Sequence, residues 1–185
     1  MQIVYKIIAA GVMAAMHPAI KGGDDPAKIV PTGEIKGHDT LLEIQLVRMI
    51  RDQKAWSELW TAHKGISDVP GAAGTIYNGD ARPAPAVDFT KNQILIVFGG
   101  HTYGVQAYDY VTTVVHDGTA VIRLAPSLFP SQSPQVIMYP YTMLTLPRLK
   151  VPIDVELDTI ANDGTHYWNK IAGYQPPKDA VKASG

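Results

Sequence analysis

The stretch ILIVFGGHTYGVQAYDYVTTVV, residues 94–115, decides the fold of this chain. It joins an apolar run to a corner with three glycines, Gly99, Gly100 and Gly104, and then to a segment rich in Val, Tyr and Thr. A phosphate-binding P-loop requires Lys and then Ser or Thr after its last glycine, whereas Val105 follows Gly104 here. The residues after the corner favour a strand over a helix. The glycines are therefore predicted to form positive-φ turns or a bulge between two strands.

The segments on either side of this stretch predict a mostly β domain. Apolar and polar residues alternate over residues 40–50 and 119–126, as in a strand with one buried face. Asp117 and Gly118 form a pair that favours a two-residue hairpin turn. Strands are predicted over residues 40–50, 91–100, 105–118, 119–126, 136–148 and 151–158. The last two are predicted to be edge strands, or bulged or bent, at three prolines that lack a ladder N–H: Pro140, Pro147 and Pro152.

One helix is predicted between the first two strands. Asp52 is a favourable N-cap for residues 53–64. Four residues recur there at helical spacing: Trp56, Leu59, Trp60 and His63. Two tryptophans on one stripe favour a core-facing ridge over an aromatic ligand cage. The predicted fold class is therefore α+β and mostly β, an antiparallel sheet or sandwich of about five to seven strands with one packed amphipathic helix.

Four parts are predicted along the chain. They are an apolar N-terminal segment over residues 1–20, a Gly/Pro linker over 21–39, the β-rich domain over 40–158, and a short helix or turn near 167–171 with a flexible tail over 159–185. Residues 7–16 have the length of a signal-peptide core, with a cleavage position before Ala15. The alternatives are an uncleaved membrane anchor and a helix docked on a partner. A membrane-associated, extracytoplasmic location at the cell envelope is expected.

Composition narrows the classes of function. The chain has 185 residues and a net charge of −1, with no block of basic residues. Nucleic acid is not expected as a partner, because phosphate binding requires a concentrated basic patch. The absence of cysteine excludes disulfides, thiolate zinc sites and cysteine nucleophiles. No cofactor is expected.

No motif indicates catalysis or metal binding. No two histidines lie at H-x-H or H-x-x-x-H spacing, and they are His17, His38, His63, His101, His116 and His166. The chain has no G-x-S-x-G motif, and no spacing brings two carboxylates together. We therefore expect neither catalytic nor metal-binding residues and do not expect an enzyme.

The order of several short features is similar to a known family. These are the Trp56–Trp60 helix, the strand entry at Asp88-Phe89, the corner glycines 99, 100 and 104, and the late strand from Pro140-Tyr141 to Pro147. Over residues 46–155 this order resembles the PrcB C-terminal-like domain family, named for a bacterial protein that stabilises a cell-surface protease complex. The resemblance implies a small exported β-rich domain that acts through protein contacts, and it does not imply an enzyme. Val105 stands where members have an aromatic residue, and the chain lacks the cysteine of its lipoprotein members.

Three functions are compared on this basis. The first is a non-enzymatic accessory or stabilising subunit of a larger envelope or membrane-associated complex, with a protease or a membrane energy-converting assembly as host and membrane contact through residues 1–20. The second is a module that binds a small ligand or peptide at an interaction corner made of Gly99, Gly100, His101, Tyr103, Gly104 and Tyr108. The least favoured is a hydrolase, which requires His101 or His116 beside a carboxylate in a cleft.

Overall fold

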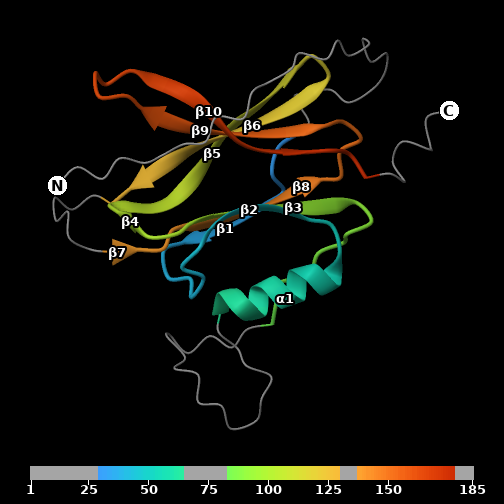
Figure 1. Cartoon of the computed structure of the whole chain (residues 1–185). Helices are drawn as coiled ribbons and strands as arrows, with labels where there is room; N and C mark the ends of the chain where they lie inside the picture. Colours follow the sequence, from blue (N-terminus) through green and yellow to red (C-terminus); the bar gives the residue numbers. More distant parts are fainter. Residues whose placement is uncertain (1–28, 65–82, 130–136, 178–185) are drawn as a thin grey trace, which may run out of the picture.

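Two β-sheets pack face to face, and a helix covers the outer face of one of them (Figure 1). The computed structural model describes residues 29–64, 83–129 and 137–177. The helix, α1 (Gln53–Lys64), lies against a four-stranded sheet that we call the helix-side sheet, and the second four-stranded sheet is called the outer sheet. The molecule therefore has three layers, with apolar material on both faces of the middle one.

The helix-side sheet is wholly antiparallel and has the apolar run of the sequence near its centre. Its order is β1 (Gly33–Gly37), β8 (Tyr141–Pro147), β3 (Asn92–Gly99) and β2 (Gln45–Ile50). The side chains of β3 from Gln93 to Phe98 are all buried, because one face of this strand meets the outer sheet and the other meets α1. That two-sided burial explains why β3 is continuously apolar instead of alternating.

The outer sheet contains a long hairpin and one parallel pair of strands. Its order is β10 (His166–Tyr174), β9 (Ile153–Ile160), β6 (Thr119–Leu128) and β5 (Val105–His116). The β5–β6 hairpin turns at Asp117 and Gly118, whose φ angles of 49° and 72° are those of a tight turn with two left-handed residues. β6 and β9 run parallel, and the other pairs of this sheet are antiparallel. A short antiparallel pair, β4 (Thr102–Tyr103) with β7 (Ile137–Met138), completes the ten strands described.

Two apolar cores hold the three layers together. The core between the sheets includes Leu95, Leu144 and Ile122, and the core under the helix includes Trp56, Phe98 and Met143. Asp52 caps α1, with the Ala55 N–H donating to its carboxylate oxygen Oδ1 at 2.8 Å. All four residues of the predicted stripe are buried, namely Trp56, Leu59, Trp60 and His63. The predicted bounds, cap and core-facing ridge of this helix are confirmed.

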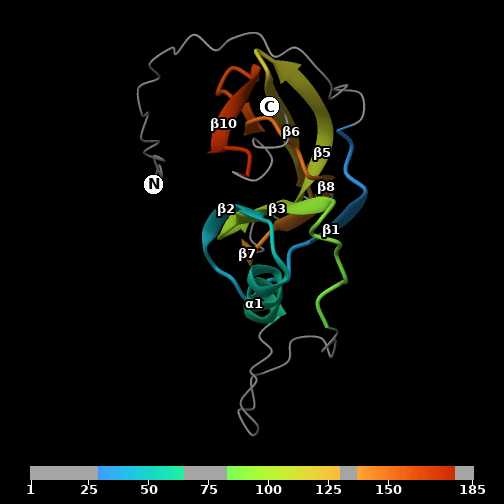
Figure 2. The same cartoon turned by 90° about the vertical axis from the view of Figure 1, so that its right-hand side faces the viewer.

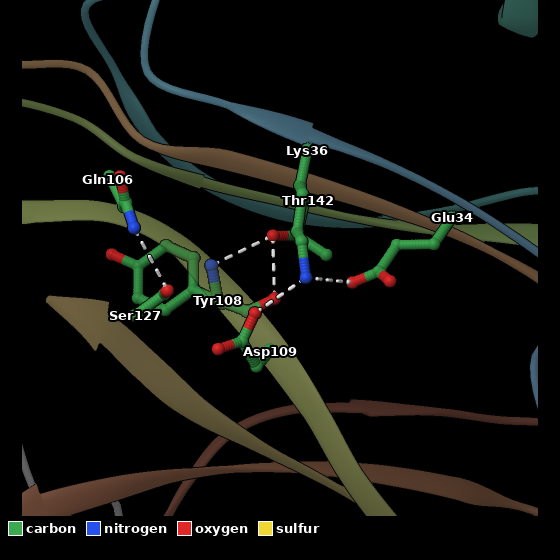
Figure 3. A network of polar contacts seen from close by, with 7 residues as sticks. All are labelled: Glu34, Lys36, Gln106, Tyr108, Asp109, Ser127 and Thr142. Carbon is green, nitrogen blue, oxygen red and sulfur yellow. Dashed lines mark hydrogen bonds and ion pairs between the residues drawn. The ribbon is translucent and has the colours of Figure 1, made fainter. Parts of the chain in front are cut away.

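Figure 2 shows that the sheets meet along both sides, β5 over β8 on one side and β10 over β2 on the other. On the first side, the Tyr108 N–H donates to Thr142 Oγ1 at 2.9 Å, and that hydroxyl donates to the Tyr108 carbonyl at 2.7 Å (Figure 3). Lys36 of β1 forms an ion pair with Asp109 of β5 at 2.7 Å beside this junction. On the other side, Arg51 donates to the carbonyl of Gln175 at 2.8 Å.

The predicted fold class is confirmed, with several corrections of detail. The ten strands exceed the five to seven predicted, and one pair is parallel. Residues 167–171 belong to strand β10, not to a helix or turn, because they pair with β9 through a hairpin at residues 161–165. β1 forms inside the segment predicted to be a linker, because it adds an edge to β8.

Of the alternatives predicted for the proline-containing strands, the edge position is wrong, whereas the predicted strand over residues 136–148 is interrupted at Pro140, between β7 and β8. β8 lies between β1 and β3, and β9 lies between β10 and β6. Both strands can be central because Pro140 and Pro152 precede them and Pro147 is the last residue of β8. The predicted N-terminal segment, residues 1–20, lies outside the described residues, as does the tail beyond residue 177. Within the described ranges, no helix is long and apolar enough to cross a membrane.

Candidate functional site

The glycine corner, residues 99–104, connects β3 to β5 and is the bend in a sheet that the sequence predicts. Gly100 and Gly104 have φ angles of 65° and 72°, and the short strand β4 lies between them. Left-handed backbone of this kind is readily adopted by glycine and strains other residues. The stretch between the two glycines, β4, pairs with β7, and the strand before the corner, β3, pairs with β8. Hydrogen bonds therefore hold both the corner and the strand that leads into it.

The first two glycines of the corner also allow other groups to approach the backbone closely. A Cβ atom on Gly99 would collide with the hydroxyl of Tyr108 and would lie 2.7 Å from Cγ of Pro140. A Cβ atom on Gly100 would lie 3.1 Å from the backbone nitrogen of Gln45. These contacts bring the start of β2 and the phenol of a β5 residue to the same point.

A hollow of about 350 Å³ opens at this point. We call it the corner hollow, and it is lined by Glu43, Gln45, Gly99, Gly100, His101, Thr102 and Tyr108. Its lining is mostly polar and includes a single carboxylate and no Lys or Arg side chain. Four of the six residues predicted to form an interaction corner line it, and Tyr103 and Gly104 do not.

Tyr108 is the buried wall of the hollow. It is only 6% exposed, and burial raises the pKa of its phenol to about 12. Its backbone is held on both sides by Thr142 (Figure 3), so the ring has a defined position. Its hydroxyl lies against Gly99 and forms no hydrogen bond with any residue in the three described ranges. A phenol hydroxyl that reaches an open hollow can exchange hydrogen bonds with a ligand there.

Sequence reasoning missed the acidic side of the hollow. Gln45 is the first residue of β2 and Glu43 lies two residues before it, more than fifty positions before the corner, and the pairing of Gln45 with Gly99 brings them there. Glu43 forms no ion pair with the Lys and Arg residues that the structure describes. No local motif announces this arrangement, because it depends on the register between β2 and β3.

Beside the hollow, β4, β7 and the end of β6 meet at one end of the molecule (Figure 1), and four large apolar residues, three of these segments and Phe129 directly after β6, are exposed. We call this group the apolar end, and it consists of Tyr103, Leu128, Phe129 and Ile137 with exposed fractions of 56%, 64%, 37% and 50%. Tyr103 and Ile137 are direct cross-strand partners. The Phe129 N–H donates to the Gly104 carbonyl at 2.8 Å, which fixes the third segment beside the first two.

The exposed histidines of the described part of the chain lie in separate places, and one of them, His166, contacts Asp158 Oδ2 through its Nδ1 at 2.8 Å. His101 lines the hollow with its ring 5.1 Å from that of Tyr103 and 6.1 Å from that of Tyr139. His116 contacts Asp117 at 3.2 Å, but both residues are exposed at the tip of a hairpin. No group of three His, Asp or Glu side chains among the described residues could hold a metal ion.

His63 is a buried histidine of a different kind. It is 0% exposed, its Nδ1 lies 2.8 Å from Thr40 Oγ1, and its Nε2 has no hydrogen-bond partner in the described structure. Its ring lies 4.3 Å from that of Tyr141 and 5.5 Å from that of Trp60. Burial lowers the pKa of His63 to about 4, so the residue is a neutral part of the core beneath α1.

Comparison of the chain with protein families, curated proteins and solved structures gave no match. The resemblance to the PrcB C-terminal-like domain family therefore stays a prediction. The geometry of the glycine corner, the corner hollow and the apolar end is the basis for assigning a function.

Proposed function

We propose that this protein is a non-enzymatic accessory or stabilising subunit of a larger complex at the bacterial cell envelope. It acts through protein contacts, and the apolar end is the surface that makes them. The observation that carries this proposal is the exposure of four large apolar side chains on three adjoining segments.

Exposed apolar side chains that are scattered singly are normal, but a group of them marks a place where another surface binds. The apolar end combines two aromatic and two aliphatic residues, a composition typical of the buried centre of a protein interface. Tyr103 and Phe129 are well suited to anchor a partner, because aromatic side chains cover a large area with few rotatable bonds.

The apolar end is also held in place before any partner binds. Thr102 and Tyr103 pair with Met138 and Ile137, and the Phe129 N–H is bonded to Gly104. A preorganised surface loses less conformational entropy on binding than a flexible one. This supports a stable, stoichiometric contact of the kind that an accessory subunit makes.

The envelope location in this proposal comes from the apolar residues 7–16, which lie outside the described residues. They favour export or membrane association. A protease complex and a membrane energy-converting assembly are both compatible hosts.

The test is affinity purification of the full chain from native membranes, followed by mass spectrometry of the proteins that accompany it. The wild-type protein is expected to retain one set of partners at fixed stoichiometry, and the double substitution Tyr103→Ser/Ile137→Ser is expected to lose it. The matched control is Val111→Ser/Val115→Ser, which removes two exposed apolar side chains from β5, outside the apolar end. Equal recovery from both variants, or no partner for the wild type, contradicts the proposal.

A second candidate is a binding module that takes a small ligand or peptide at the glycine corner without being part of a larger complex. The corner hollow, with the unpaired hydroxyl of Tyr108, favours it. Native mass spectrometry of the purified protein separates the two candidates. A bound small molecule on an otherwise solitary chain supports the module, and co-purified protein subunits support the accessory role.

A further inference from the structure

We infer that the corner hollow binds the cationic end of a Lys or Arg side chain presented by the partner protein. This inference rests on the proposed function and adds to it the chemistry of the partner. The apolar end supplies contact area, and the adjacent hollow selects a partner segment with a basic residue beside its apolar residues.

The hydroxyl of Tyr108 is the first reason. The ring of Tyr108 is buried, and its hydroxyl, which forms no hydrogen bond with the described residues, lies at the wall of the hollow beside Gly99. A phenolic oxygen can accept a hydrogen bond from an ammonium or guanidinium N–H. Thr142 holds the Tyr108 backbone through both its N–H and its carbonyl, so this acceptor has a fixed position.

The charge of the residues that line the hollow determines the charge of the ligand it can bind. Glu43 is its only carboxylate, and no Lys or Arg lines it. Apart from His101, no group in the lining can carry a positive charge, so a cation placed there would form a charge-assisted hydrogen bond with Glu43 whereas an anion would be repelled by it. The amide oxygen of Gln45 can serve as another acceptor next to Gly99. A Lys ammonium has three donors to satisfy, and a carboxylate, an amide and a phenol match that number.

The form of the hollow fits a side chain more closely than a large cofactor. It has a volume of about 350 Å³ and is open to solvent, which places it at the small end of ligand sites. The two glycines at its base carry no Cβ, so the backbone of the corner does not fill the space.

The hollow and the apolar end are joined by β4. Thr102 lines the hollow, and the next residue, Tyr103, belongs to the apolar end. The rings of His101 and Tyr103 lie 5.1 Å apart, so no other segment separates the two surfaces. One extended segment of a partner can therefore place a basic side chain in the hollow and apolar side chains on the apolar end.

The test uses the full-length ¹⁵N-labelled protein and small probes, so it does not depend on knowing the partner. The probes are the N-acetyl methylamides of lysine and arginine, with those of norleucine and glutamate as controls. At pH 7 the two basic probes are expected to shift the amide signals of Gly99, Gly100 and Thr102, with dissociation constants on the order of millimolar for a single side chain. The norleucine probe, which keeps the alkyl chain without the charge, is expected to leave these signals in place.

Two substitutions locate the binding groups. Glu43→Gln is expected to weaken binding of the lysine probe about tenfold, the loss typical of one hydrogen bond to a charged group. Tyr108→Phe keeps the ring and removes the hydroxyl, and it is expected to weaken binding about threefold to tenfold while the remaining spectrum stays that of the folded protein. Glu58→Gln on the exposed face of α1 is the matched control and is expected to bind as the wild type does.

Binding of the norleucine or glutamate probe at the same amides with equal affinity would overturn the inference. So would unchanged binding of the lysine probe by Glu43→Gln, or no shift with either basic probe. None of these outcomes touches the proposed function, which is read from the loss of partners when the apolar end is changed.

Discussion

Among single residues, His63 connects the packing of the helix most directly to solution conditions. Its ring is enclosed by aromatic side chains beneath α1, and its Nδ1 forms a hydrogen bond with the hydroxyl of Thr40. The charged groups nearest to it are Lys64, which lowers its pKa, and Asp39, which raises it to a smaller degree than burial lowers it. The helix is therefore docked on a histidine that must stay neutral.

The stability of the protein is expected to fall on acidification because of His63. The pKa of His63 is about 4 in the folded protein, whereas an unperturbed histidine, as in the unfolded chain, has a pKa of 6.5. As the pH falls below about 6.5, the unfolded chain therefore takes up a proton before the folded protein does. The contribution of neutral His63 to the free energy of unfolding is fully present above about pH 6.5 and is lost as the pH falls to about 4, a change of roughly 3 kcal/mol. Urea unfolding of the wild type and His63→Phe from pH 7 to pH 4 measures it.

The comparison with the variant matters because other groups also titrate in this range. The difference between wild type and His63→Phe should change with pH by that amount, and His63→Leu serves if the larger ring does not fit. Parallel curves for the wild type and both variants would contradict the assignment.

At the scale of elements, one hydroxyl group links β5 to β8 by hydrogen bonds. Thr142 Oγ1 accepts from the Tyr108 N–H and donates to the Tyr108 carbonyl, and all these groups are buried. The two sheets are thus joined by a side chain that takes the place of a backbone ladder. The same contact positions the wall of the corner hollow.

Thr142→Val is expected to lower the free energy of unfolding by about 2–3 kcal/mol, because the isosteric side chain leaves a buried N–H and carbonyl unpaired. Thr145→Val, on the same strand, is the control and is expected to change stability by less than about 0.5 kcal/mol. The Thr145 side chain is only partly buried, and the hydrogen bond that Thr145 accepts uses its backbone carbonyl, which the substitution keeps. Guanidinium unfolding of both variants gives the two values. A Thr142→Val protein as stable as the control would show that the junction contributes little.

At the scale of the whole molecule, the domain reaches further in both directions than the sequence predicted. Ile29 is buried in the core between the sheets, and β1 pairs with β8 along its full length. At the other end, β10 pairs with β9, and Ile171 and Tyr174 pack against the same core. The folded unit therefore includes residues on both sides of the predicted span 40–158.

A chain that begins at residue 40 is expected to unfold at much lower temperature than one that begins at residue 29, or not to fold cooperatively. It lacks the burial of Ile29, which stabilises by about 2 kcal/mol, and it exposes the edge of β8 that β1 covers. Thermal unfolding followed by circular dichroism compares the two chains with the full-length protein. Equal melting temperatures would mean that the sequence-based boundary at residue 40 was adequate.

Local signals in the sequence predicted the elements that depend on neighbours along the chain. The cap at Asp52, the stripe of α1 and the turn at Asp117-Gly118 are all of this kind. β10 was missed because its aromatic segment resembles a short helix until its partner β9 is known, although Gly164, with a φ angle of 82°, marks the turn. The hollow could not be predicted, because Glu43 and Gly99 meet only through the register of β2 with β3.

The parallel pairing of β6 with β9 has a consequence for the order of assembly. Between these strands in the chain lie β7 and β8, and β8 belongs to the opposite sheet. The chain path from β6 to β9 therefore crosses to the helix-side sheet and returns. Contacts between residues this far apart in sequence slow folding in proteins of this size. The molecule is expected to gain its two cores in a single concerted step, with the last third of the chain deciding when that step occurs.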